Sequence, residues 1–89
     1  MENLNNFELK KFSHLDYPNI DFNDLKKLGV YYFPQNGLNR CKNSPAFDQG
    51  VLLVFAPYYT YQKYLTGIFE FKRYYNYDLK IWSEWKKVI

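Results

Sequence analysis

Hydrophobic and polar positions in the second half of the chain follow the two-residue period of β-strands. Val51–Ala56 is apolar at every position, which is typical of a central strand covered on both faces. The next two segments, 59–65 and 68–75, alternate between apolar and polar side chains, and Thr66-Gly67 between them predicts a turn. Strands that follow each other at about ten-residue spacing with short turns predict an antiparallel meander.

The last segment, residues 79–89, alternates once more after a turn at residues 76–78. Neighbouring side chains of a regular strand point to opposite faces, so this pattern predicts Trp82 and Trp85 on opposite faces of one strand. We therefore expect one of the two indoles to be structural and the other to lie at an interface or a binding surface.

Before these strands, the sequence predicts a short helical turn and one further strand. Asp21 or Asn23 can cap a turn over residues 24–28, with Gly29 in the stopping position. The β-branched and aromatic run that follows, residues 29–33, predicts a strand that ends before a proline.

Two segments carry no strand pattern. Residues 34–50 are dense in Asn, Gly, Pro, Ser and Asp, which is typical of a loop, and a loop of this length in a small domain is often functional. Residues 1–18 have a weak helical spacing that Pro18 would end, but the same segment could be an extended lead-in. We divide the chain into a lead-in segment, 1–18, and one domain, 19–89.

The fold class predicted from these patterns is all-β, or β-rich α+β, with a small antiparallel meander sheet and a short helical turn near residue 24. The 89 residues allow one domain, yet they include 10 Tyr, 8 Phe and 2 Trp. At about 150 Å² per ring, these side chains could bury roughly 3,000 Å², more than so small a core can enclose. Some rings should therefore face a partner. The residues expected in the core are Tyr31, Phe33, Val51, Leu53 and Phe55.

Composition excludes most enzymatic and metal chemistry. The net charge of +3 is spread evenly, so we do not expect a nucleic-acid partner. One Cys and one His leave no internal disulfide and no multi-cysteine zinc site, and the four glycines are too far apart for a phosphate loop or a dinucleotide-binding motif. We therefore expect no catalytic residues, metal or cofactor. Arg40 and Lys42 could lower the pKa of Cys41, but no base or second thiol accompanies it. No apolar stretch is long enough to cross a bilayer, so we expect no membrane insertion.

From residue 21 onward, the order of motifs resembles the pyocin-knob type of domain at the tips of phage tail fibres. The ending Trp82–Val88 (WSEWKKV) is similar to the Trp-Ser-x-Trp-Lys-Lys-hydrophobic strand that closes many such domains. The other matching pieces are the opening 21–25, the Gly-x-Tyr-Tyr strand 29–32, the loop motif 43–45, the central strand 50–55, the glutamine-bearing strand 61–64 and the pair Arg73-Tyr74. The fibre shaft usual in the family is missing, and residues 1–18 match nothing in it.

This resemblance implies a non-enzymatic receptor-binding domain on the virion, at a fibre tip, in a homotrimer that recognises a bacterial surface glycan. Rings that stack on sugars and a cation in the long loop are the expected contacts. The candidate ligand-binding residues are Tyr58, Tyr59, Tyr74, Tyr75, Trp85 and Arg40.

Two other functions are compatible with the sequence. A free-standing small phage protein in the host cytoplasm could bind and inhibit a host protein. A single-stranded nucleic-acid binding module could use the basic and aromatic residues of 72–75 for stacking.

Overall fold

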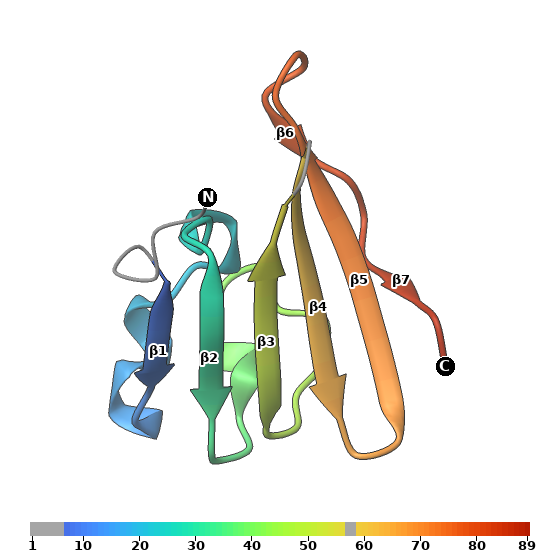
Figure 1. Cartoon of the computed structure of the whole chain (residues 1–89). Coiled ribbons are helices and arrows are strands. Elements are labelled where there is room, and N and C mark those ends of the chain that lie inside the picture. Colours follow the sequence, from blue (N-terminus) through green and yellow to red (C-terminus); the bar gives the residue numbers. More distant parts are fainter. Residues whose placement is uncertain (1–6, 57–58) are drawn as a thin grey trace.

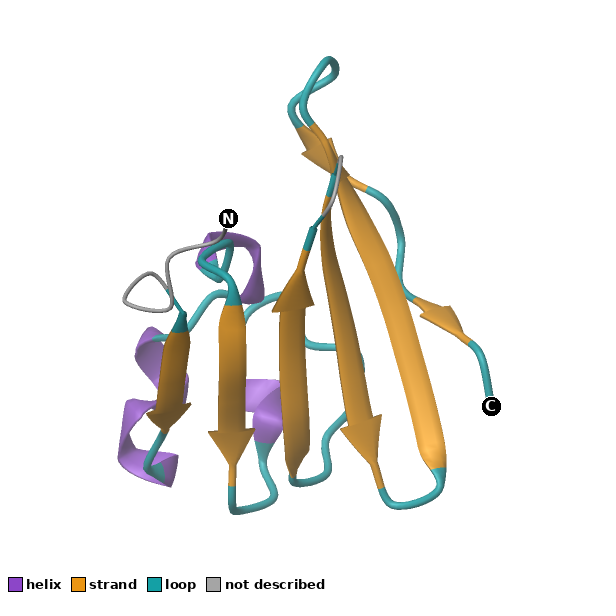
Figure 2. Cartoon of the chain, in the orientation of Figure 1, coloured by secondary structure: helices purple, strands orange, loops and turns teal. Residues whose placement is uncertain are grey.

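The computed structural model describes residues 7–56 and 59–89, which form one sheet with short 3-10 helices against one of its faces (Figures 1 and 2). Along the sheet the order is β1-β2-β3-β4-β5-β6, and β7 also pairs with β5. All pairs are antiparallel except β1 with β2. The strands are β1 (Glu8–Lys11), β2 (Gly29–Phe33), β3 (Gly50–Phe55), β4 (Thr60–Thr66), β5 (Phe69–Asn76), β6 (Ile81–Trp82) and β7 (Lys86–Lys87). The predicted β-rich class is confirmed.

The inner face of the sheet holds the core. Three 3-10 helices, η2 (His14–Asn19), η3 (Phe22–Asp24) and η4 (Leu38–Arg40), cover this face. Each inserts one side chain that is fully buried, namely Tyr17, Phe22 and Leu38. These pack against inward side chains of β2, β3 and β4, for example Phe33, whose ring lies 5.0 Å from that of Phe22. The predicted turn near residue 24 is η3, and the side chain of Asp21 caps it.

The N-terminal segment joins the sheet. Residues 8–11, for which the sequence allowed a helix or a lead-in, form the edge strand β1, and Pro18 lies inside η2 instead of ending a helix. Gly29 was expected to stop a helix. It begins β2, where an added Cβ would collide with the Glu8 carbonyl oxygen of β1.

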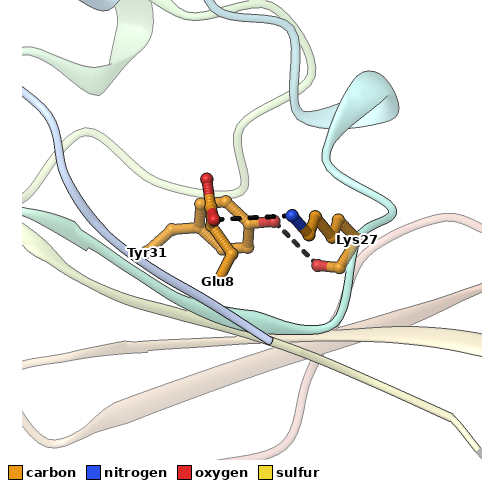
Figure 3. Close-up of polar contacts among 3 residues, drawn as sticks. All are labelled: Glu8, Lys27 and Tyr31. Atoms are coloured by element: carbon orange, nitrogen blue, oxygen red, sulfur yellow. Dashed lines mark hydrogen bonds and ion pairs between the residues drawn. The ribbon is translucent and has the colours of Figure 1, made fainter. Parts of the chain in front are cut away.

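In Figure 3, the Tyr31 hydroxyl donates to the Lys27 carbonyl over 2.7 Å, and the Lys27 ammonium lies 3.7 Å from the Glu8 carboxylate.

The prediction of one continuous strand over residues 79–89 is wrong. The structure has two strands of two residues, β6 and β7, which pair with opposite ends of β5. Lys80, just before β6, adopts a left-handed backbone with φ of 57°, which a continuous strand excludes. Because residues 83–85 between the strands are irregular, Trp82 and Trp85 are not on opposite faces of one strand.

The outer face of the sheet, which we call the open face, is not covered by any described segment (Figure 2). Val51 and Leu53 lie half-buried on it and Phe55 is exposed, so the expectation that they belong to the core is wrong. The buried residues of β3 are the alternate ones, Leu52 and Val54. Because β3 has apolar side chains on both faces, the sequence predicted that both faces would be buried. The described residues bury only the inner face.

Candidate functional site

A cleft lies where β5, β6 and η3 meet, with a volume of about 630 Å³. Residues of β6 line this cleft, and β6 lies at the upper end of the sheet in Figure 1. We call it the Trp–Arg cleft. It is lined by Asn23, Asp24, Lys26, Asn43, Arg73, Tyr75 and residues 80–85.

Arg73 is the central residue of this cleft. Its guanidinium carbon lies 4.2 Å from the ring centre of Trp82 and 4.6 Å from that of Trp85, so two indoles flank one cation. The Arg73 Nε donates to the Gln62 side-chain oxygen over 2.8 Å. Arg73 is 6% exposed, and within the described residues its Nη2 has no hydrogen-bond partner.

Gln62 connects this arginine to η3. Its side-chain nitrogen donates to the carbonyls of Phe22, over 2.6 Å, and Leu25, over 3.0 Å. Gln62 is fully buried in β4, directly opposite Arg73 in β5. A buried amide that uses both donor hydrogens and its acceptor is held in one orientation. Arg73 therefore has a fixed position between the two indoles.

Each indole is also fixed by its own N–H. Trp82 Nε1 donates to the Asn23 carbonyl over 3.1 Å, and Trp85 Nε1 donates to the Asn43 carbonyl over 2.8 Å. Trp85 packs against the core, with its ring edge-on to Phe22 at 6.3 Å. Both rings remain partly exposed in the cleft, which gives rigid aromatic surfaces at a wet site.

The rim of the cleft carries mixed polar groups. Asp24 and Glu84 are acidic, and Lys26 and Lys80 are basic. The Lys26 ammonium lies 3.9 Å from the centre of the Tyr75 ring. The side-chain oxygen of Asn23 is buried and has no hydrogen-bond partner within the described residues. Hydrogen-bond donors and acceptors thus stand beside the ring surfaces.

Burial also changes the acid–base properties of the site. Loss of water around Arg73 lowers the pKa of its guanidinium to about 10, and the nearby Asp21 partly opposes this shift. At neutral pH the arginine is still a cation. Among residues 7–56 and 59–89, no group of three or more His, Cys, Asp and Glu could hold a metal ion.

The structure separates the predicted site residues into three places. Tyr75 and Trp85 lie together in the cleft. Tyr59 and Tyr74 lie on the open face, with their ring centres 5.7 Å apart. Arg40 is in neither place. Its guanidinium lies over the Tyr17 ring at 5.2 Å and its Nε donates to the Gly37 carbonyl. Tyr58 is outside the described residues.

Sequence reasoning missed Trp82, Arg73 and Asn23 as members of one site. Because β5 alternates regularly, Arg73 lies on the face that carries Phe71 and Tyr75. The signal that could have identified it was this single cation on an otherwise aromatic face. Its pairing with two indoles depends on the irregular residues 83–85, which strand alternation does not describe.

Cys41 differs from its expected chemistry. The flanking cations suggested a lowered thiol pKa, but the side chain is buried against the core, and desolvation raises its pKa to about 11. A thiol of this kind is inert at neutral pH.

Compared with protein-family models, with curated proteins and with solved structures, the chain matches none of them. None of the helices in the described part of the chain is long and apolar enough to span a membrane.

Proposed function

We propose that this chain is a non-enzymatic recognition domain that binds a bacterial surface glycan in the Trp–Arg cleft. The observation that carries the proposal is the pair of indoles held on either side of buried Arg73. Their hydrogen bonds to the backbone fix the rings before any ligand arrives. A preorganised aromatic surface loses little conformational entropy on binding, which favours recognition of a weakly interacting ligand such as a sugar.

The chemistry of the cleft supports a sugar as the ligand. Sugars present apolar C–H faces, which pack on rings such as Trp82 and Tyr75. Their hydroxyl groups both donate and accept hydrogen bonds, which suits a rim with carboxylates at Asp24 and Glu84 and an ammonium at Lys26. A strongly anionic or cationic ligand would meet like charges at this mixed rim.

The place of the domain in its assembly follows from the resemblance to pyocin-knob domains and is part of the proposal. On that basis the domain stands at a tail-fibre tip of the virion, where a cleft that binds one short glycan weakly would gain avidity from further copies of the domain.

Binding to isolated envelope glycans from a broad panel of bacterial strains tests the proposal. Trp82→Ala removes one ring wall and should weaken binding about tenfold or more, which corresponds to ~1.4 kcal/mol. Phe47→Ala is the matched control, because Phe47 is an exposed ring outside the cleft and its loss should leave binding unchanged. Equal thermal melting of both variants would show that the difference is local.

Two outcomes would contradict the proposal. One is a chain that binds no glycan and no whole cells across the panel. The other is tight binding to single-stranded oligonucleotides that falls steeply with salt, which would favour the nucleic-acid alternative.

A further inference from the structure

The open face of the sheet is more apolar than a water-facing sheet face normally is. An antiparallel sheet with one wet face usually carries polar residues there. Here the outward side chains include Tyr32 at 43% exposed, Phe55 at 40% and Leu65 at 37%. The open face consists of Leu9, Lys11, Val30, Tyr32, Val51, Leu53, Phe55, Tyr59, Tyr61, Lys63, Leu65, Glu70, Lys72 and Tyr74. An apolar surface that extends over five strands marks an interaction site.

The size of the open face fits one copy of the chain. Five strands about 4.8 Å apart, with six residues of about 3.3 Å each, cover roughly 480 Å² in projection. Side chains that stand out from the sheet make the accessible area larger than its projection. Two such faces together approach the roughly 1,200 Å² at which stable interfaces begin.

The shape of the face also suits a second sheet. A sheet twists with a fixed hand, so its face is a saddle, and sheets of the same twist pack on each other at about 30°. A copy of the same chain supplies such a sheet with an equally apolar face.

The charges on the face are arranged so that two copies complement each other. One row across the sheet runs from Lys11 on β1 to Glu70 on β5, with apolar side chains between them. The row consists of Lys11, Tyr32, Val51, Leu65 and Glu70, each directly opposite the next. A twofold axis parallel to the strands lays β1 of one copy over β5 of the other. Lys11 of each copy then meets Glu70 of the other, and Val51 meets Val51 at the centre.

The neighbouring row contains no opposite-charge contact between the copies. It consists of Leu9, Val30, Leu53, Lys63 and Lys72, so its two lysines lie over apolar residues of the other copy, Lys63 over Val30. Leu53, at the centre of this row, also faces its own copy. Lys72 then lies over Leu9, where its alkyl stem can pack while the ammonium reaches water at the rim. Within one chain, the Glu70 carboxylate lies 3.8 Å from the Lys63 ammonium. In the pair, Glu70, the only carboxylate of the open face, would therefore lie between Lys63 of its own copy and Lys11 of the other.

We infer that two copies of this chain pair through their open faces into a β-sandwich, with Lys11 of each copy against Glu70 of the other. The pairing involves residues other than those of the Trp–Arg cleft and does not depend on what the cleft binds.

Sedimentation of the purified chain at about 50 μM tests the pairing, because interfaces of standard size reach micromolar affinity or better. We expect a dimer. Leu53→Glu places two carboxylates face to face at the centre and should give a monomer of unchanged melting cooperativity. Ile68→Glu is the matched control, since Ile68 is 80% exposed in the β4–β5 turn outside the face, and it should remain a dimer.

Charge exchange tests the predicted register. K11E alone and E70K alone each place like charges together twice and should weaken the dimer about tenfold or more. An equimolar mixture of K11E and E70K chains restores both opposite-charge contacts, so the mixture should dimerise better than either chain alone. Only a twofold pair with this register predicts that recovery.

Three results would overturn the inference. They are a monomer at this concentration, an oligomer of any size that is indifferent to Leu53→Glu, and a mixture of the K11E and E70K chains that dimerises no better than its components.

Discussion

At the scale of single residues, buried polar side chains determine how the cleft is held. Gln62 has all of its hydrogen-bonding capacity directed inward, to η3 on one side and to Arg73 on the other. An apolar residue here would fit the sheet, but it would leave the Leu25 carbonyl and the Arg73 Nε–H without partners. The Phe22 carbonyl would keep only its bond from the Leu25 N–H. The same side chain therefore stabilises the domain and positions the arginine between the indoles.

Gln62→Leu should therefore lower the free energy of unfolding by about 3 kcal/mol or more, because each buried group left unpaired costs ~1–3 kcal/mol. The control is Thr66→Val in the same strand and on the same face, which loses one hydrogen bond to the Gln49 carbonyl and should cost only about 1 kcal/mol. Urea unfolding of the two variants measures the difference. Equal losses of unfolding free energy in the two variants would show that Gln62 does not connect η3 to Arg73.

At the scale of elements, regular strands were predictable and short irregular ones were not. β2, β3, β4 and β5 have alternation or β-branched runs long enough to define both their type and their inward face. β1 has the sequence ELKK. It is a strand because it pairs in parallel with β2, which begins eighteen residues after β1 ends. Its sequence alone carries no such signal.

The cleft was only partly predictable for the same reason. Tyr75 was predicted because it flanks a turn. Trp85 was predicted because strand alternation placed one of the two indoles at a surface, although the continuous strand behind that reasoning is wrong. The partners that complete the site, Arg73 and Trp82, come together through two-residue strands and the left-handed turn at Lys80. These depend on tertiary contacts with β5, which a periodic pattern does not contain.

Attachment of β1 depends on Gly29, and this gives a prediction for one element. Gly29→Ala places a Cβ against the Glu8 carbonyl oxygen, so β1 must shift or detach, at a cost of about 1–3 kcal/mol. Hydrogen exchange should show faster exchange of the β1 amides and little change in β3 and β4. Gly67→Ala is the control. A Cβ at this position meets no atom within 4 Å, and the φ of 58° strains only the β4–β5 turn. The protection of the β1 amides from exchange should therefore be unaffected. Unchanged protection in Gly29→Ala would contradict the close approach.

At the scale of the whole molecule, a one-sided core explains the aromatic excess. The buried rings are those of Phe12, Tyr17, Phe22, Tyr31, Phe33 and Tyr64. The other aromatic side chains of the described residues are half-buried or exposed, and most of them lie in the cleft or on the open face. The expectation that so small an interior cannot hold all the rings is confirmed for the described part of the chain.

Core burial also sets the response of the fold to alkali. Desolvation raises the pKa of the Cys41 thiol to about 11, from an ordinary 9.0. It also raises the pKa of the Tyr17, Tyr31 and Tyr64 phenols above their ordinary 10.0. In each case the unfolded chain loses its proton first, so stability present at neutral pH is lost as the pH rises. Arg73 acts in the opposite direction, because burial lowers its pKa to about 10 in the fold, below the value in the unfolded chain, but only above about pH 10.

The free energy of unfolding should therefore be constant near neutral pH and begin to fall near pH 9, where the unfolded thiol of Cys41 ionises. Above pH 10 the three buried phenols should steepen the fall, since together they outweigh the single guanidinium. Cys41→Ala separates the two stages, because it removes the first and should leave the free energy flat until the tyrosines begin to titrate. Urea titrations at closely spaced pH values measure both curves. A Cys41→Ala curve that falls as steeply as the unmodified chain's between pH 9 and 10 would contradict burial of the thiol as the cause.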